Sequence, residues 1–119
     1  MKRAFRLTRS TDFERVRRSG KSYPHPLLVL VACPNPGGEV RVGVVAGRSV
    51  GCAVKRNRAK RLLRASMDSL VAELKPGFDI LLLSRGPLPE AGYQKTRATL
   101  EALLRRAKLV SEPNGTEQS

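Results

Sequence analysis

The chain has 119 residues, enough for one domain with a modest hydrophobic core. Its 23 Lys and Arg residues outnumber 10 Asp and Glu residues, which gives a net charge of +13. Residues 1–64 hold 16 basic and 3 acidic residues, whereas residues 65–119 hold 7 of each, so the excess lies in the first half. We therefore expect a partner of dense negative charge, a nucleic acid first and an anionic membrane surface second.

The composition also excludes several protein classes. No apolar run is long enough to span a membrane, and the basic amino terminus lacks the apolar segment of a signal peptide. Cys33 and Cys52 lack the spacing of a zinc site and lie among apolar residues, so we expect two free thiols packed as small hydrophobic groups. These features predict a cytoplasmic, reduced protein that does not span a membrane.

A basic arm and a short helix are expected first. Residues 1–9 form the arm, in which three arginines either are solvated or contact phosphates: Arg3, Arg6 and Arg9. Thr11 and Glu14 have the spacing of a capping box, which predicts a helix from Asp12 to about Arg18. Gly20 would end this helix.

Two runs rich in apolar residues follow. They cover Leu27–Cys33 and Val40–Ala46, with a turn cluster at Pro34–Gly38 between them. We interpret the two runs as strands of a hairpin. The pattern leaves open whether Tyr23 belongs to the first strand or to its approach.

The most informative stretch is Val54–Arg64, with the sequence VKRNRAKRLLR, which holds six cations and no acid. Residues with helical three- and four-residue spacing predict one buried face: Ala59, Leu62, Leu63, Ser66, Met67, Leu70 and Leu74. The opposite face then carries Asn57, Arg61 and Arg64, flanked by Arg58 and Lys60. We expect Ser49 to cap this helix and Lys75–Gly77 to end it.

This concentration of charge predicts a ligand. Like charges one turn apart repel, and a row of phosphates would offset that cost while releasing counterions. Arginine suits bidentate phosphate contacts, and Asn57 can both donate and accept hydrogen bonds. We therefore expect this face to bind a nucleic acid.

The remaining elements complete a small α+β sandwich. We expect a strand at Phe78–Ser84, a loop at Arg85–Pro89 and a helix at Tyr93–Leu109. That last helix has an apolar face of Leu100, Leu103, Leu104 and Ala107. Residues 111–119 are almost free of apolar side chains and are expected to be disordered, which leaves 1–110 as a single RNA-binding domain. The order α-β-β-α-β-α predicts helices covering one sheet.

Catalysis by the polypeptide itself is not expected. The single histidine, His25, lies between two prolines, and the acids are scattered without paired spacing. Asp12 and Glu14 are interpreted as cap residues, Asp68 as a partner of Arg64, and Asp79 as a strand residue. We therefore expect no catalytic residue and no metal held by protein side chains.

The motifs resemble those of a known family. Arg41-Val42-Gly43, followed by Gly51-x-Ala53-Val54-x-Arg56-Asn57-Arg58-x-Lys60-Arg61-Leu62-x-Arg64, resembles the signature of the bacterial ribonuclease P protein subunit. Leu7, Asp12-Phe13, Gly20 and Asp79-Ile80 also match the family pattern. The resemblance covers about residues 6–105.

The resemblance implies a non-catalytic role. In that family an RNA subunit with bound Mg²⁺ cuts precursor tRNA to release its 5′ leader, and no protein partner is required. The residues implied to face the catalytic RNA are Arg48, Lys55, Arg56, Asn57, Arg58, Lys60, Arg61 and Arg64. A cleft between the first helix and the sheet would take the leader, lined by Phe13, Val16, Arg17 and Val31.

The resemblance also implies a particular sheet. It would be similar to the sheet of a ribosomal-protein domain, with Lys21–Tyr23 as a candidate fourth strand. The crossover through the basic helix would be left-handed, an exception to the usual rule.

Three departures from the family pattern bear on leader binding. Gly47-Arg48-Ser49 replaces a Ser-Lys-Lys segment, and Arg17 and Val31 stand where aromatic residues are common. We therefore expect leader binding to depend more on charge than on stacking, with Arg15, Arg17 and Arg18 beside the leader path.

Other interpretations remain. A ribosomal or general RNA-chaperone protein would have the same size and charge but would not need the ordered signature. A membrane-surface helix would place Trp and Phe on its apolar face, and this stretch has neither. A double-stranded DNA binder would be expected to show helix-turn-helix spacing, which is not evident.

Overall fold

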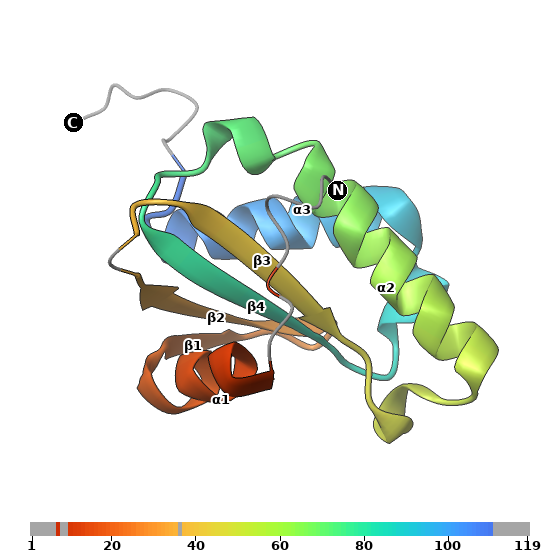
Figure 1. Ribbon diagram of the computed structural model, residues 1–119. Coiled ribbons are helices and arrows are strands. Elements are labelled where there is room, and N and C mark those ends of the chain that lie inside the picture. The colour runs from red at the N-terminus through yellow and green to blue at the C-terminus, as the bar shows by residue number, and fades with distance from the viewer. Residues whose placement is uncertain (1–6, 8–9, 36, 111–119) are drawn as a thin grey trace.

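The computed structural model describes residue 7 and residues 10–35 and 37–110. The rest of the expected arm and the tail at 111–119 lie outside the described residues. Figure 1 shows the elements of the described part: α1 (Ser10–Ser19), β1 (Lys21–Pro24), β2 (Leu28–Pro34), β3 (Val40–Val45), the 3-10 turn η2 (Arg48–Val50), α2 (Ala53–Asp68), the 3-10 turn η3 (Val71–Glu73), β4 (Phe78–Ser84) and α3 (Leu88–Arg106). The predicted α+β class is confirmed, and Tyr23 belongs to the separate strand β1.

The described strands form a four-stranded sheet in the order β1-β2-β4-β3. β1 and β4 each pair with β2 antiparallel, whereas β3 pairs with β4 parallel. The predicted hairpin of β2 and β3 is therefore wrong, because β4 lies between these strands. Ile80, Leu81 and Leu82 of β4 are fully buried, and such a continuous apolar run is typical of a central strand covered on both faces.

The turn between β2 and β3 spans the start of β4. Gly77, which directly precedes β4, accepts a hydrogen bond from the Asn35 N–H at 2.8 Å and donates one to the Glu39 carbonyl at 3.1 Å. The amide of Asn35 also donates to the Glu39 carbonyl at 2.8 Å. The segment between β2 and β3 has the composition of a hairpin turn, but it passes over the start of β4, which lies between the two strands.

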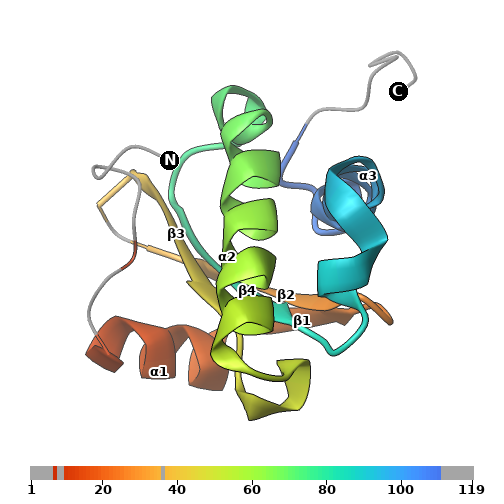
Figure 2. The ribbon, with the colours of Figure 1, turned by 90° about the vertical axis from the view of Figure 1, so that its right-hand side faces the viewer.

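Helices cover both faces of the sheet. Figures 1 and 2 show α2 and α3 side by side over one face and α1 over the other. The strand residues alternate accordingly, since Leu28, Leu30 and Ala32 of β2 belong to the larger core, whereas Val31 and Cys33 belong to the smaller one. The handedness of the β3-α2-β4 crossover stays a prediction.

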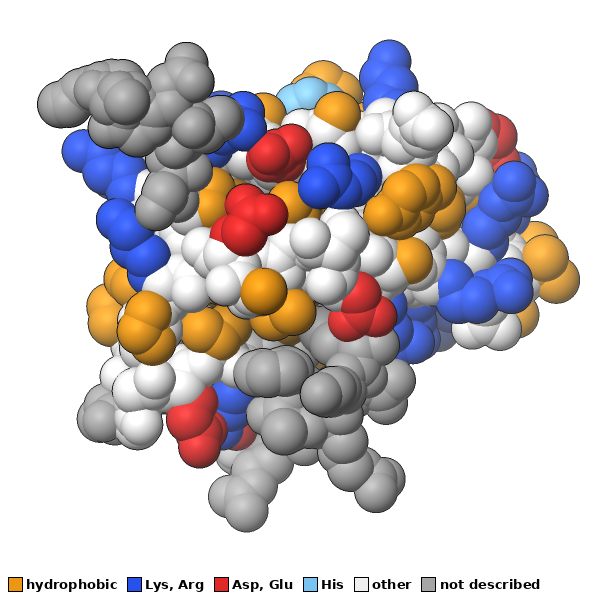
Figure 3. Space-filling view, turned by 90° about the horizontal axis from the view of Figure 1, so that it is seen from above, with side chains coloured by type: hydrophobic (Ala, Val, Ile, Leu, Met, Phe, Trp, Pro, Cys, Tyr) orange, Lys and Arg blue, Asp and Glu red, His pale blue; other side chains and the backbone are white. Residues whose placement is uncertain are grey.

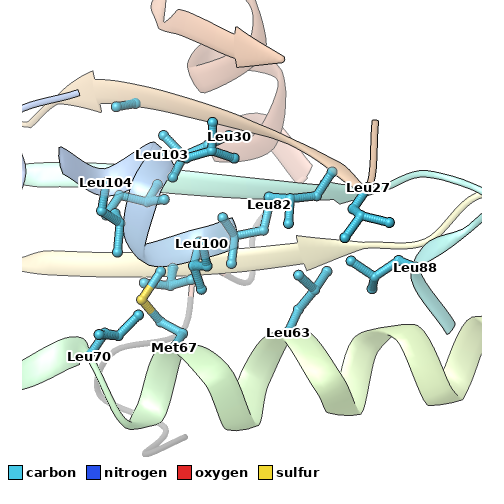
Figure 4. Close-up of a cluster of buried hydrophobic side chains, with 14 of the residues drawn as sticks. Leu27, Leu30, Leu63, Met67, Leu70, Leu82, Leu88, Leu100, Leu103 and Leu104 are labelled. Atoms are coloured by element: carbon cyan, nitrogen blue, oxygen red, sulfur yellow. The ribbon is translucent and has the colours of Figure 1, made fainter. Parts of the chain in front are cut away.

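The larger core lies between the sheet and the two long helices, and many of its residues are leucines (Figure 4). The inward residues of the α2 segment include Leu63, Met67 and Leu70, each 0% exposed, and Leu100, Leu103 and Leu104 of α3 face them. The predicted apolar faces of these helices are therefore confirmed, except that Leu62, Leu74 and Ala107 are only partly buried.

Several predicted helix ends are displaced. α1 begins at Ser10, so Thr11 lies inside the helix and the predicted capping box is wrong. α2 begins at Ala53 with Cys52 at its N-cap, because Ser49 belongs to the preceding 3-10 turn η2. α2 ends at Asp68, well before Lys75–Gly77. α3 begins at Leu88 but is kinked at Gly92, one residue before the predicted start.

Two glycines let α1 approach the sheet closely. A Cβ atom on Gly20 would lie 2.5 Å from the Val16 carbonyl oxygen and 2.7 Å from a Val31 methyl carbon. A Cβ atom on Gly43 would lie 2.6 Å from the Phe13 ring. The glycines of the Arg41-Val42-Gly43 motif and of the α1 terminus are therefore required by packing.

A buried carboxylate fixes α1 to the sheet. Asp79 of β4 is 0% exposed, and it accepts hydrogen bonds from Arg41 Nε at 2.9 Å, Arg41 Nη2 at 2.8 Å and Asn35 Nδ2 at 2.9 Å, and a further one from Arg15 of α1. Arg41 also pairs with Asp12 of α1 at 3.6 Å, so Asp12 is part of this cluster and not a cap. Burial raises the pKa of Asp79, but the hydrogen bonds from its three partners outweigh burial and hold that pKa below its ordinary value.

Removing this charge should loosen α1. We expect Asp79→Asn to lower the free energy of unfolding by about 2–4 kcal/mol, because two arginines lose their shared acceptor. Urea denaturation monitored by circular dichroism measures this change. The exposed-acid variant Glu73→Gln is the control and should change stability little.

The same carboxylate predicts a pH dependence. Because its folded pKa is depressed, its stabilising contribution is fully present above the unfolded pKa of about 4 and is lost as pH falls through the lower folded pKa. The unfolding free energy of Asp79→Asn should therefore fall less steeply than that of the wild type below about pH 4. Equal slopes for the two proteins would contradict this role of Asp79.

The buried face of α2 gives a second prediction. Leu63→Asp should destabilise the protein by about 4 kcal/mol or more, since it places a charge in the leucine core. Ala65→Asp makes the same kind of change at an exposed position of the same helix and should be tolerated. Thermal unfolding of both variants compares them, and a cooperative, unchanged melt of Leu63→Asp would show that this face is not packed.

Candidate nucleic-acid interface

The basic helix α2 presents its charge outward, as the sequence predicts. Ala59, Leu63 and Met67 are 0% exposed on its inner side, while its exposed residues include Lys55, Asn57, Arg58 and Arg61. Figure 3 shows Lys and Arg side chains at the right-hand end of the molecule, which is the end where α2 begins in Figure 1, and others at its left-hand end. Core packing therefore holds the cations on the outer side.

Four of the predicted residues line one hollow of about 380 Å³, which we call the basic hollow: Asn57, Lys60, Arg61 and Arg64. Among the described residues, neither Lys60 nor Arg61 has an ion pair with an acid, whereas Arg64 takes part in an interaction within the protein. The positive charges of Lys60 and Arg61 are therefore not neutralised by carboxylates of the described residues. Such a concave set of donors around one amide is suited to phosphate and base edges.

The start of α2 differs from the expectation in several details. Arg48 is exposed on η2, and Val54 is 73% exposed. Lys55 pairs with Glu90 of α3 at 3.7 Å, but both side chains are more than half exposed, so this pair contributes little to stability. Arg56 is only half exposed, and its Nε atom is buried without a hydrogen-bond partner among the described residues.

The two cysteines occupy different surroundings. Cys33 is buried beside α1, as predicted. Cys52 is exposed at the N-cap of α2, so the expectation that it packs as a hydrophobic group is wrong. Its side chain makes no capping hydrogen bond of ordinary geometry, yet the N–H groups of Lys55 and then Val54 are directed at the sulfur and lower the pKa of the thiol.

A second hollow, of about 410 Å³, lies where α1, the end of β3 and α2 meet. We call it the α1 hollow, and its lining residues are Phe13, Glu14, Arg17, Val44, Val45, Ala46 and Lys60. It has an apolar floor from the end of β3 and cations from two helices at its rim. Phe13 and Arg17 were predicted from the sequence, but Val44 and Val45 of β3 and Ala46 directly after it were not. The only sequence signal for these three residues was their place at the end of an apolar run.

Two residues expected in the cleft are not part of its lining. Val16 is 0% exposed and Val31 is 3% exposed, and both belong to the smaller core under α1. They face the sheet–helix interface because α1 packs directly over β2. Arg15, expected beside the leader path, is instead bonded to Asp79, while Arg17 and Arg18 are exposed.

Lys60 belongs to both hollows. It lines the basic hollow together with Arg61 and also the α1 hollow together with Phe13. One surface therefore leads from the floor of the α1 hollow over Lys60 to the outer side of α2. A single strand carrying phosphates at regular intervals could contact both hollows without leaving the protein surface.

Within the described residues, no group of three His, Cys, Asp or Glu side chains is placed to hold a metal ion. The membrane-spanning criterion of length and apolarity is met by none of the described helices.

Known sequences similar to this chain share one description. A family model described as Ribonuclease P matches residues 1–108. The Ribonuclease P protein component of Herpetosiphon aurantiacus is 37% identical over 109 residues, which cover 92% of this chain and 89% of that protein. The protein of the same description from Chloroflexus aggregans is 39% identical over 114 residues, covering 95% of this chain and 84% of the relative.

Solved structures agree with the sequence comparisons. The RNase P protein of Staphylococcus aureus superposes with a TM-score of 0.82 at 26% identity, covering 92% of this chain and 100% of that chain. The RNase P protein of Thermotoga maritima gives a TM-score of 0.75 at 30% identity, covering 85% of this chain and 96% of that chain. Because the family model and these relatives extend over nearly the whole chain, the protein belongs to the bacterial ribonuclease P protein family.

Proposed function

We propose that this protein is the RNA-binding, non-catalytic subunit of a ribonuclease P. It binds the catalytic RNA through the outer side of α2 and holds the 5′ leader of precursor tRNA in the α1 hollow. The RNA, with its own Mg²⁺, cuts the leader from the tRNA. The names of the relatives support the assignment to this enzyme, and the residues of the two hollows support the division of roles.

The observation that carries the proposal is the basic hollow. Lys60 and Arg61 lie on an outer surface without acidic partners among the described residues, while Leu63 anchors the same helix in the core. This arrangement costs repulsion in the free protein, and a polyphosphate partner removes that cost. Asn57 in the same hollow adds a group that can distinguish base edges from phosphates.

The leader is assigned to the α1 hollow by its shape and chemistry. Val44, Val45 and Phe13 give an apolar floor against which an unpaired base can pack, and Arg17 and Lys60 stand at the rim for phosphates. Phe13 is the single aromatic residue in that lining, so charge contributes most of the affinity.

Mg²⁺ is assigned to the RNA and not to protein side chains. Two acids near α1 already have basic partners. Asp79 is hydrogen-bonded to two arginines and an asparagine, and Asp12 forms an ion pair with Arg41. Glu14 lines the α1 hollow together with Arg17 and Lys60 and no other acid. None of these carboxylates is grouped as a two-metal site requires.

Reconstitution tests the proposal. Added to purified ribonuclease P RNA at low Mg²⁺, the protein should speed the release of the leader from precursor tRNA, and it should cleave nothing when alone. Arg61→Ala should weaken binding to that RNA by about 1–3 kcal/mol and lower the slope of log K against log salt by about one unit, without changing the thermal melt.

Lys95→Ala is the matched control, because Lys95 is an exposed cation on α3, away from both hollows. It should leave RNA affinity nearly unchanged. Equal losses for Arg61→Ala and Lys95→Ala would mean that net charge alone drives binding. Equal affinity for ribosomal RNA would favour a general RNA-chaperone role.

Leader binding gives a separate prediction. In a series of precursor tRNAs with leaders of increasing length, the affinity gained per nucleotide should fall as salt rises, with a slope of about −0.7 for each phosphate contacted. Filter binding or fluorescence anisotropy measures this series. A leader contribution that does not change with salt would mean that stacking on Phe13 dominates instead.

A further inference from the structure

A third hollow lies apart from the two that line the proposed RNA path. It has a volume of about 590 Å³, within the range of small-molecule sites, and we call it the proline hollow. Its lining comes from the end of β1, the β1–β2 connection and the β4–α3 connection: Pro24, His25, Pro26, Arg85, Gly86 and Pro87. None of these residues has a role in the function proposed above.

Backbone and side-chain hydrogen bonds fix the two connections against each other. The Leu27 N–H donates to His25 Nδ1 at 3.0 Å, and the Leu27 carbonyl accepts from the Arg85 N–H at 2.9 Å. The Arg85 carbonyl accepts from the Leu88 N–H at 3.1 Å and from the Ser84 hydroxyl at 3.1 Å. Leu27 and Leu88 are themselves buried in the core beneath, where Figure 4 shows them close together. The hollow is therefore preformed.

The hydrogen bond to His25 determines what the imidazole can offer a ligand. Nδ1 uses its lone pair to accept from Leu27, so the ring proton is on Nε2, which remains a donor. Arg85 is exposed at the same hollow and contributes a guanidinium group. The three prolines give rigid apolar walls, and no acidic residue is in the lining. The proline hollow therefore combines the apolar surface of three prolines with two hydrogen-bond donors, on His25 and Arg85, that suit an anion.

We propose that the proline hollow binds one unpaired nucleotide, with its base against the proline rings and its phosphate contacted by Arg85 and by His25 Nε2–H. A base supplies the flat apolar faces that the prolines can cover, and a phosphate supplies acceptors for both donors. A lone inorganic anion would leave the apolar walls unused, and an uncharged ring would leave Arg85 unused.

The position of the hollow favours an RNA strand as the source of that nucleotide. A Cβ atom on Gly86 would lie 3.4 Å from the Ser49 carbonyl oxygen, so the hollow adjoins η2 and the chain that enters α2. An RNA that contacts the start of the basic helix can thus reach the hollow. The choice of RNA rests on the proposed function, whereas nucleotide binding itself does not.

The single histidine makes the test direct, because its side-chain NMR signals need no separate assignment. Adenosine 5′-monophosphate titrated into the full chain should shift the imidazole signals of His25 and the backbone amides of Arg85 and Gly86, with a Kd of about 1 mM. Adenosine and inorganic phosphate, titrated separately, should each bind about tenfold more weakly. Arg85→Ala keeps the backbone hydrogen bonds and should also weaken nucleotide binding about tenfold.

Lys95→Ala removes the same charge elsewhere and should leave the Kd unchanged. The proposal is overturned if the nucleotide leaves the His25 signals unmoved, if both variants weaken binding equally, or if inorganic phosphate or an acidic peptide shifts His25 as much as the nucleotide does. Shifts confined to amides around Arg61 would assign nucleotide binding to the basic hollow instead. If the nucleotide shifts the His25 signals but α2 does not bind RNA, nucleotide binding by the proline hollow is supported and the proposed function is contradicted.

Discussion

The carboxylate of Asp79 is the interaction on which the position of α1 depends. It is enclosed on the sheet face opposite α2 and α3, and its hydrogen-bond partners come from α1, β3 and the turn after β2. A buried charge is tolerated only when it is so fully paired. With α1 fixed in this way, Phe13 lies directly over Gly43, and the gap between α1 and α2 becomes the α1 hollow. The family motifs around Asp12, Arg41 and Asp79 are thus explained by docking of one helix.

The basic helix presents the opposite electrostatic situation. Lys60 and Arg61 lie on its outer side without an acidic partner among the described residues. The free energy that keeps the helix in place comes from leucines and a methionine on its inner side and from the partner helix α3. Stability and binding are therefore separated by face along a single helix. A residue such as Leu63 affects the fold, while its neighbour Arg61 lies at the surface offered to a ligand.

The sequence predicted those features that depend on local periodicity. The inner and outer sides of α2, the apolar strand β4 and the apolar face of α3 follow from the spacing of Leu63, Met67, Ile80 and Leu100. The predicted pairing of β3 with β2 was wrong, because the true partner of β3 is 38 residues away along the chain, as for Arg41 and Asp79. Likewise, nothing in the pattern distinguished Val16, which packs under α1, from Phe13, which lines a hollow. His25 and Arg85 come together because β2 pairs with β4 and because Leu27 bonds to both residues.

The parallel pairing of β3 with β4 has one further consequence. α2 lies between these two strands in the sequence. The chain before the helix leads from β3 and the chain after it leads into β4, and these two strands are hydrogen-bonded to each other. Leu63 and Met67 of the helix also share the larger core with Ile80 and Leu82 of β4, so a shift of the helix would disturb that core. A molecule that binds α2 in the folded protein would therefore raise the free energy of global unfolding, and not only the stability of the helix itself.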